Sequence, residues 1–157
     1  MASTLTKAEV RDLEKQYVAR LNVPDADAYT DRSARRSARV RAKLDCHLNV
    51  PYGDSPGQVL DVFPALKSGA PVHIFIHGGY WRNPDLTKDT YSHMAAPMVA
   101  AGAAVVLPDY DLCPAVSITE IVRQTRRAVT WVYRNIAKFN GDPKRIYVSG
   151  HSAGGHL

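Results

Sequence analysis

The chain has 157 residues, of which 45% are hydrophobic, and this length suffices for one hydrophobic core but not for two ordinary domains. Its net charge of +5 bears on solubility and electrostatic steering, and it identifies neither a fold nor a chemistry. The two cysteines, Cys46 and Cys113, lie far apart without a C-x-x-C spacing, which argues against a disulfide framework or a zinc ribbon and favours a reducing compartment.

The N-terminal region is expected to be helical. Thr6 and Glu9 have the spacing of a capping box, and apolar residues then recur at helical intervals, which predicts an amphipathic helix from Lys7 to about Arg20. A basic cluster follows between Arg32 and Lys43, and no aromatic residue is interleaved there to stack on a base. We therefore expect this cluster to be the solvated face of a helix and not a nucleic-acid-binding arm.

A hairpin and a buried strand are predicted next. The segments Lys43 to Val50 and Gln58 to Phe63 have strand character, and the intervening Pro51 to Gly57 is dense in turn formers. These segments predict a hairpin at the edge of a sheet. Val72 to Ile76 is apolar on both faces, as in a strand of a parallel sheet that helices cover on both sides.

Helices and strands alternate over the rest of the chain. We expect a helix from Tyr91 to Ala101, a strand from Ala103 to Leu107, a long helix that begins after Ser117, and a strand from Ile146 to Ser149. This alternation predicts an α/β fold with a mostly parallel sheet and helices on both faces.

The predicted domain organisation is a helical segment over residues 1–40 and an α/β domain over residues 41–157. The opening residues lack the apolar core of a secretory signal. The most apolar stretch, Met94 to Leu107, is interrupted by Pro97 and Gly102 and is shorter than the ~20 residues of a membrane span. We expect a soluble, cytoplasmic protein without a membrane partner.

The predicted strand at Ile146 to Ser149 leads into a G-x-S-x-G motif. Ser152 occupies its centre, and Gly150 and Gly154 lie two residues to either side. A serine at the tip of a sharp strand-to-helix turn has strained backbone angles, and larger side chains two residues away would collide, which explains the glycines. The motif predicts that Ser152 is a nucleophile and that free N–H groups at the start of the next helix face a developing oxyanion.

A second motif follows the strand at Val72 to Ile76. Its sequence is His77-Gly78-Gly79-Tyr80-Trp81. It is the kind of His-Gly-Gly loop whose backbone amides complete an oxyanion hole in α/β-hydrolases. The two motifs occur in the expected order, and together they predict a serine hydrolase.

Three segments resemble the signature of the kynurenine formamidases, which are esterase-like α/β-hydrolases. They are residues 77–81, residues 109–114 and residues 150–157. The broader carboxylesterases related to hormone-sensitive lipase share most of these residues. Tyr80-Trp81 stands where those esterases usually have a third glycine, and Leu-Cys-Pro follows Asp111, which favours the formamidase branch.

The resemblance implies an α/β-hydrolase fold truncated after the nucleophile elbow, and it assigns the site residues. Ser152 is the implied nucleophile, and the main-chain N–H groups of Gly79, Tyr80 and Ala153 form the implied oxyanion hole. The implied reaction hydrolyses N-formylkynurenine to kynurenine and formate without a metal or an organic cofactor. The N-terminal helix resembles a segment that shields the site. The expected partner is a small-molecule substrate, a homodimer is left open, and nucleic acid is not expected.

The acid and the base of a catalytic triad are not found. In this fold they follow the serine, and the chain stops five residues after Ser152. His156 lies four residues after the serine, but its side chain is expected to lean back along the helix surface, which disfavours it as the base. His77 is expected to serve the oxyanion loop, and no ligand spacing such as H-E-x-x-H predicts a metal site.

Two consequences follow for a chain without the acid and the base. We expect a loss on the order of 10⁶ in kcat relative to an intact triad. We also expect the strand that leads to Ser152 to have an unpaired outer edge, which makes the chain prone to associate. Two alternatives remain open: a broad carboxylesterase that acts on short-chain esters, and a non-catalytic fragment or binding module that keeps only the scaffold.

Overall fold

The computed structural model describes residues 5–157, and the chain divides into two units, Met1–Arg32 and Ser33–Leu157. In the first unit, helix α1 (Lys7–Tyr17) begins at the expected capping box. The hydroxyl of Thr6 accepts from the Glu9 N–H, and the Glu9 carboxylate accepts from the Thr6 N–H at 2.7 Å. A short 3₁₀ helix, η1 (Ala19–Asn22), follows.

Helix α2 (Ala26–Lys43) contains the basic cluster, which is largely exposed, as expected for a solvated helix face. Ser37 is its buried residue, and the Ser37 hydroxyl donates to the carbonyl of Thr90 at 2.8 Å and accepts from the N–H of His93 at 2.9 Å. The boundary expected between residues 40 and 41 falls within this helix. Because α2 continues to Lys43, the first strand begins at His47, later than expected.

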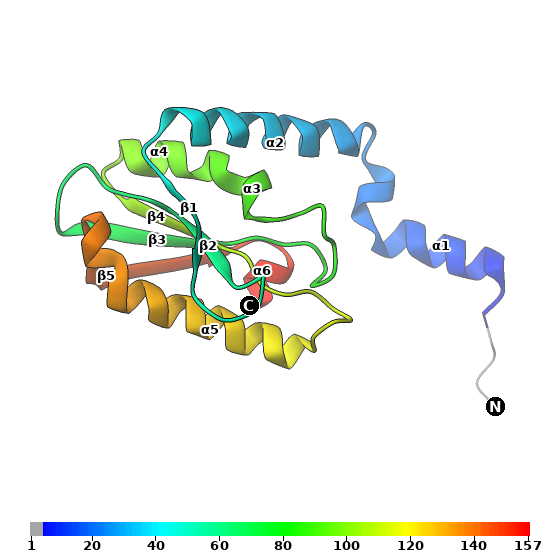
Figure 1. Cartoon of the computed structure of the whole chain (residues 1–157). Coiled ribbons are helices and arrows are strands. Elements are labelled where there is room, and N and C mark those ends of the chain that lie inside the picture. The colour runs from blue at the N-terminus through cyan, green and yellow to red at the C-terminus, as the bar shows by residue number, and fades with distance from the viewer. Residues whose placement is uncertain (1–4) are drawn as a thin grey trace. The chain divides into compact units, whose positions relative to one another are not determined.

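A five-stranded sheet forms the centre of the second unit, with the strand order β1-β2-β4-β3-β5 (Figure 1). Strands β1 and β2 form the expected hairpin at one edge, and β2 pairs antiparallel with β4. Strands β4, β3 and β5 run parallel, so the sheet is mixed and its antiparallel part comes from the hairpin. The strands are β1 (His47–Pro51), β2 (Val59–Phe63), β3 (Ala70–Ile76), β4 (Ala104–Pro108) and β5 (Gly141–Gly150).

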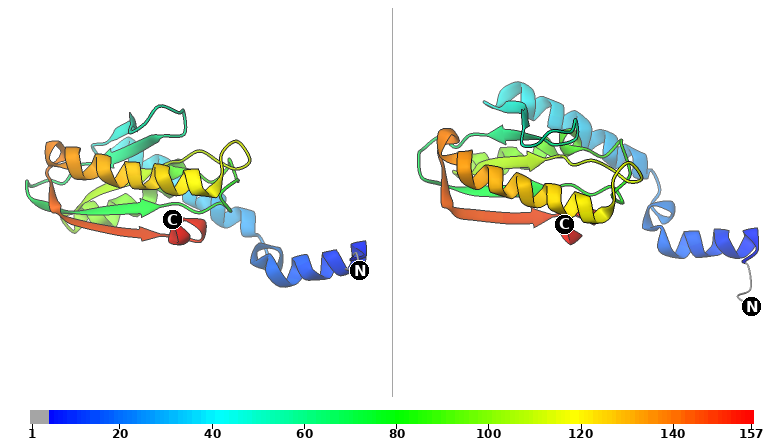
Figure 2. Two further views of the ribbon diagram at one scale, coloured as in Figure 1. Left: turned by 90° about the horizontal axis from the view of Figure 1, so that it is seen from below. Right: turned by 60° about the horizontal axis from the view of Figure 1, so that its bottom comes forward.

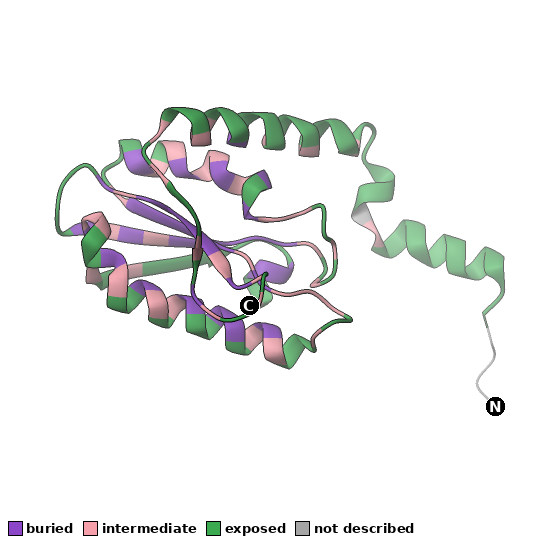
Figure 3. Ribbon diagram, viewed as in Figure 1, coloured by how far each residue is buried: buried purple, intermediate pink, exposed green. Residues whose placement is uncertain are grey.

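One face of the sheet packs against α5 (Ile118–Asn135) and the 3₁₀ helix η3 (Ile136–Phe139). The hydroxyl of Ser117 caps α5 by accepting from the Glu120 N–H, and the buried side of α5 includes Ile121 and Val132, as its periodicity predicts. Figure 3 shows this buried side against the strands, whose central residues are also buried. No helix among residues 5–157 is long and apolar enough to span a membrane.

The opposite face packs against α3 (Lys88–Tyr91), η2 (Ser92–Met94) and α4 (Ala95–Ala100), as two further views show (Figure 2). These three short elements replace the single helix expected from Tyr91 to Ala101. Proline is tolerated in the first turn of a helix but not in its interior, and Pro97 lies in the first turn of α4. With helices on both faces of the sheet, the expected α/β fold is confirmed.

Candidate active site

The loops that carry the candidate residues leave the same edge of the sheet. Strands β3, β4 and β5 are parallel, so their carboxyl ends lie together. The loop after β3 starts at His77, the loop after β4 starts at Asp109, and the turn after β5 holds Ser152. Ligands of open α/β sheets bind outside the carboxyl ends of the strands. The fold therefore brings both predicted motifs to the edge where a site is expected.

Ser152 lies at a sharp turn between β5 and the short helix α6 (Ala153–His156). Its φ of 54° and ψ of −119° are unusual for a residue other than glycine, and its side chain is exposed. A Cβ on Gly150 would lie 2.2 Å from the carbonyl oxygen of Gly154, and a Cβ on Gly154 would lie 2.1 Å from that of Ile76. The two glycines are therefore required by backbone contacts on both sides of the serine.

The His-Gly-Gly loop lies directly against this turn. A Cβ on Gly78 would lie 2.8 Å from the carbonyl oxygen of His151 and 3.0 Å from Cβ of Ser152. Beyond Gly78 the backbone has positive φ at three successive residues, with 125° at Gly79, 55° at Tyr80 and 58° at Trp81. The two motifs therefore meet in space, as a shared active site requires.

The main-chain N–H groups that the resemblance assigns to the oxyanion hole have no acceptor among the described residues of the protein. Within residues 5–157, no hydrogen bond is formed by the N–H of Gly79, Tyr80 or Ala153. A backbone N–H that is buried away from water without a hydrogen-bond partner costs free energy. Such groups at a site are available to bind an anionic oxygen. Their availability fits the predicted role.

His77 holds the loop in place. Its ring is buried, Nδ1 lies 2.7 Å from the carbonyl oxygen of Gly78, and the ring of Tyr110 stacks on it at 4.4 Å and 6°. Nε2 lies 2.9 Å from Oδ1 of Asp109, without the alignment of a hydrogen bond. Nδ1 is thus engaged by the loop backbone and Nε2 faces the Asp109 carboxylate, so His77 supports the loop and does not act as a base for Ser152.

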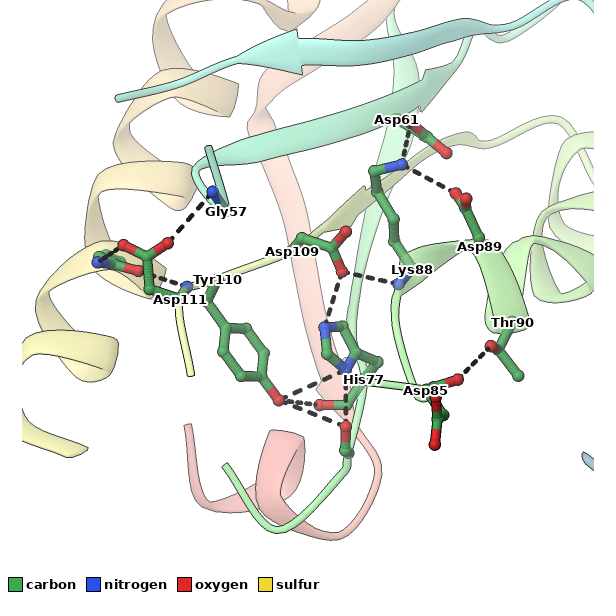
Figure 4. A network of polar contacts seen from close by, with 12 residues as sticks. Gly57, Asp61, His77, Asp85, Lys88, Asp89, Thr90, Asp109, Tyr110 and Asp111 are labelled. Carbon is green, nitrogen blue, oxygen red and sulfur yellow. Dashed lines mark hydrogen bonds and ion pairs between the residues drawn. The ribbon is translucent and has the colours of Figure 1, made fainter. Parts of the chain in front are cut away.

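A buried ion pair between α3 and β2 extends this support (Figure 4). Oδ1 of Asp109 accepts the backbone N–H of Lys88 at 2.8 Å, and Nζ of Lys88 lies 3.0 Å from Oδ1 of Asp61 and 2.9 Å from Oδ1 of Asp89. Burial raises the pKa of Asp61. Burial alone would lower the pKa of Lys88, but its contacts with Asp89 and Asp61 outweigh burial and raise that pKa, so the ammonium stays charged.

The loop after β4 is fixed by its neighbours on two sides. The buried hydroxyl of Tyr110 donates to the carbonyl of His77 at 2.9 Å, and burial raises the pKa of this phenol, which keeps it a neutral donor. The Asp111 carboxylate accepts from the Gly57 N–H at 3.2 Å and from the Gln124 side chain at 2.8 Å. These bonds tie the loop to the β1–β2 turn and to α5.

The remaining histidines near the elbow make other contacts. The ring of His156 lies edge-on to Trp81 at 5.3 Å, the ring of His151 lies 6.2 Å from Tyr91, and Nε2 of His73 lies 2.7 Å from the Ser149 hydroxyl. In the part of the chain that the structure describes, no histidine nitrogen forms a hydrogen bond with the Ser152 hydroxyl, and no cluster of three metal-ligating side chains is found. No described histidine therefore forms the nucleophile–base contact of a triad.

Sequence reasoning identified both motifs but missed the ion pair that supports them. Asp61 is fully buried within β2, and a charged residue in an otherwise apolar strand is a signal that it has a partner. The partner, Lys88, lies in a segment whose sequence reads as an ordinary exposed helix start. Only the folded chain places the two together.

The chain is similar in sequence to a formamidase and to esterases. A family profile described as BD-FAE matches residues 60–157. A kynurenine formamidase of Salmo salar is 40% identical over 121 residues, which cover 76% of this chain and 39% of that protein. Esterase LipC of Mycobacterium tuberculosis is 35% identical over 111 residues, which cover 69% of this chain and 27% of that protein. The chain thus spans about two fifths or less of the length of these relatives.

A solved structure shows the same architecture. A candidate thioesterase from Silicibacter sp. TM1040 superposes with a TM-score of 0.81 at 34% sequence identity. The match covers 92% of this chain and 53% of that one. It confirms the hydrolase-type arrangement of strands and helices.

Proposed function

Because the chain belongs to the BD-FAE family and has the α/β-hydrolase fold, we propose that it is the nucleophile-bearing part of a serine hydrolase. The contact between Gly78 and Ser152 is the main support for this proposal, because it places the nucleophile turn next to the His-Gly-Gly loop. The N–H groups of Gly79, Tyr80 and Ala153, which lack protein acceptors among the described residues, support an oxyanion hole at this contact.

The proposed substrate is an aryl formamide, namely N-formylkynurenine. Kynurenine formamidases of three animals are 34–40% identical to the chain over 110–121 residues. Tyr80 and Trp81 in the oxyanion loop favour the same branch. Tyr80 is 63% exposed in the loop that contacts the nucleophile turn through Gly78, and an aromatic substrate can contact it there.

The proposed reaction proceeds by acyl transfer. The Ser152 oxygen attacks the formyl carbon, and the carbonyl oxygen becomes an oxyanion that the backbone N–H groups stabilise. The carbon–nitrogen bond then breaks, the arylamine leaves with a proton, and a formyl ester remains on Ser152. Water attacks this ester, which releases formate and restores the serine hydroxyl.

The reaction also needs a base that takes the proton of Ser152 and an acid that orients the base. In this fold both follow the serine, in the order serine, acid, histidine. The relatives extend well beyond the part they share with this chain, and we propose that the corresponding segment supplies both groups.

Comparing two substrates tests the proposed specificity. We expect a higher kcat/KM for N-formylkynurenine than for a short p-nitrophenyl ester. Both substrates are measured on one protein that includes the segment proposed to supply the acid and the base. A preference of a hundredfold or more for the ester would reject the formamide and support a broad carboxylesterase. That second function is favoured by the matches to LipC at 35% and to carboxylesterase NlhH of Mycobacterium tuberculosis at 39% identity.

A fluorophosphonate probe tests whether the serine is activated at all. Stoichiometric labelling that is lost in Ser152→Ala supports a nucleophile. The protein tested includes the segment proposed to supply the acid and the base, and absence of labelling there supports the alternative of a non-catalytic fragment or binding module.

Cellular location and assembly complete the proposal. We propose a cytoplasmic protein, which the free cysteines Cys46 and Cys113 support. The homodimer stays a prediction, supported by Tyr147 and Val148 of the edge strand β5, which are 60% and 53% exposed. The shielding role of residues 1–40 also stays a prediction.

A further inference from the structure

We propose that a groove along the outer side of α5 binds a phosphate chain, such as that of a nucleoside triphosphate or of inorganic tripolyphosphate. The groove has a volume of about 600 Å³, and four arginines and two aromatic residues line most of it: Arg123, Arg126, Arg127, Arg134, Trp131 and Tyr52. None of its lining residues belongs to the nucleophile turn or to the His-Gly-Gly loop. The groove therefore has no role in the hydrolase chemistry proposed above.

The periodicity of α5 creates the positive charge of the groove. Residues three and four apart on a helix are neighbours on its surface, and Arg123, Arg126 and Arg127 have this spacing. Arg134 follows Arg127 at seven residues, two turns along the same side. Like charges this close repel one another, so an anion that binds to the cluster relieves this repulsion.

The described residues neutralise only part of this charge. Glu120 contacts both Arg123, at 3.4 Å, and Arg127, at 3.2 Å. Arg126 and Arg134 have no carboxylate partner within residues 5–157. Two of the four guanidinium groups therefore share one carboxylate, and the other two are free to bind a ligand.

Hydrogen bonds and ring packing hold the floor of the groove. The Tyr52 side chain is 9% exposed, and its hydroxyl donates to the carbonyl oxygen of Asp109 at 2.6 Å. The Trp131 ring packs on Phe139 at 6.2 Å. Gln58 accepts from Arg127 at 3.1 Å and so fixes one of the four guanidinium groups against the β1–β2 turn. The groove is thus partly pre-organised, which lowers the entropic cost of binding.

A phosphate chain fits this arrangement better than a single carboxylate does. Each guanidinium presents a planar fork of donors that matches two phosphate oxygens. Several forks along one groove can contact successive phosphates, whereas a carboxylate would leave most of them unused. The aromatic floor can in addition stack on the base of a nucleotide, as aromatic side chains do elsewhere.

Isothermal titration calorimetry of the full chain with sodium tripolyphosphate tests the proposal. We expect saturable 1:1 binding that weakens as salt is raised. Arg126→Gln/Arg134→Gln should weaken binding at least tenfold. The control Arg11→Gln/Arg35→Gln, which removes the same charge from exposed positions on α1 and α2, should change affinity less than twofold. All four arginines are exposed, so both variants should keep the circular dichroism spectrum of the parent chain.

Two outcomes would overturn the proposal. One is no saturable binding by the parent chain, and the other is equal weakening in both double variants, which would mean unspecific attraction to a basic protein. A second titration with ATP distinguishes a nucleotide ligand from an inorganic phosphate chain. Tighter binding of ATP than of tripolyphosphate assigns the groove to a nucleotide whose base contacts the aromatic floor, and equal affinity assigns it to the phosphate chain alone.

Discussion

Gly78 and Ser152 are so close that a methyl group on the glycine would lie 3.0 Å from Cβ of the serine. Nonbonded carbon atoms prefer about 3.5–4.0 Å, so this contact leaves no room for any other residue at position 78. The oxyanion loop and the nucleophile turn are thus positioned by direct contact.

Gly78→Ala should displace the loop from the turn. Loss of one oxyanion donor costs about 10²–10³ in kcat, and we expect this variant to lower the rate of fluorophosphonate labelling at least ~10-fold in a protein that includes the segment proposed to supply the acid and the base. Gly155→Ala is the matched control, because a Cβ there would meet the Gly150 carbonyl group at the ordinary distances of 3.5 Å to its oxygen and 3.9 Å to its carbon. Equal labelling rates in the two variants would contradict the assignment of the loop.

Ser152→Gly should stabilise the protein while abolishing labelling. A residue other than glycine held in sparsely populated φ/ψ costs about 1–3 kcal/mol, and glycine removes most of this strain. We expect the free energy of unfolding to rise by about 1 kcal/mol in urea denaturation. Ser152→Ala keeps the Cβ and should show little change, so a similar gain in both variants would argue against backbone strain.

Asp109→Ala should loosen the support of the oxyanion loop. It would leave the buried Lys88 N–H without its acceptor and His77 without its carboxylate, which should cost about 1–3 kcal/mol of unfolding free energy. Asp109→Asn keeps the accepting oxygen and should cost less. Thermal unfolding measured beside the labelling rate checks this, and equal losses in the two variants would show that the charge alone matters.

Lys88→Met should be strongly destabilising. It leaves the Asp61 carboxylate buried without its cation, which typically costs about 3–5 kcal/mol. Lys88→Met/Asp61→Leu should recover most of this loss, because replacing both partners removes the uncompensated charge. Lys144→Met, at an exposed position, is the control and should leave the urea midpoint unchanged. A double variant no more stable than the single one would refute the pairing.

His73 should make stability depend on pH. Burial lowers the pKa of this half-buried imidazole below its usual 6.5, so the unfolded chain takes up a proton before the folded chain does. Stability should therefore fall as pH drops from 7 through 6.5 towards the lower folded pKa. His73→Gln should flatten this dependence in urea titrations between pH 5 and pH 7, and the exposed-site variant His47→Gln should follow the parent curve.

The elements that could be predicted from sequence are those with a local cause. The glycines at 150 and 154 follow from the steric demands of one turn, and the apolar run at Val72 to Ile76 follows from burial on both faces of one strand. The predicted start of β1 was wrong, because the apolar–polar alternation over Lys43 to Val50 is too short to distinguish the end of a helix from a strand.

What could not be predicted depends on contacts between distant segments. Nothing near Lys88 in the sequence indicates that its side chain is buried against Asp61, 27 residues earlier. The role of Asp109 as the carboxylate facing His77 likewise exists only once β3 and β4 are paired. Supporting residues of this kind carry no motif, since their position is set by the sheet and not by spacing along the chain.

The parallel pairing of β3 with β5 has a consequence for when reactivity appears. The pair nearest the carboxyl ends of these strands is Ile76 and Gly150, and the chain between the two strands includes β4 and α5. Pairing between segments so distant in sequence forms slowly. The hydroxyl at position 152 can become reactive only after this final pairing. In a protein that includes the segment proposed to supply the acid and the base, a fluorophosphonate pulse applied during refolding would therefore mark the molecules that have completed the sheet and leave the partly folded ones unlabelled.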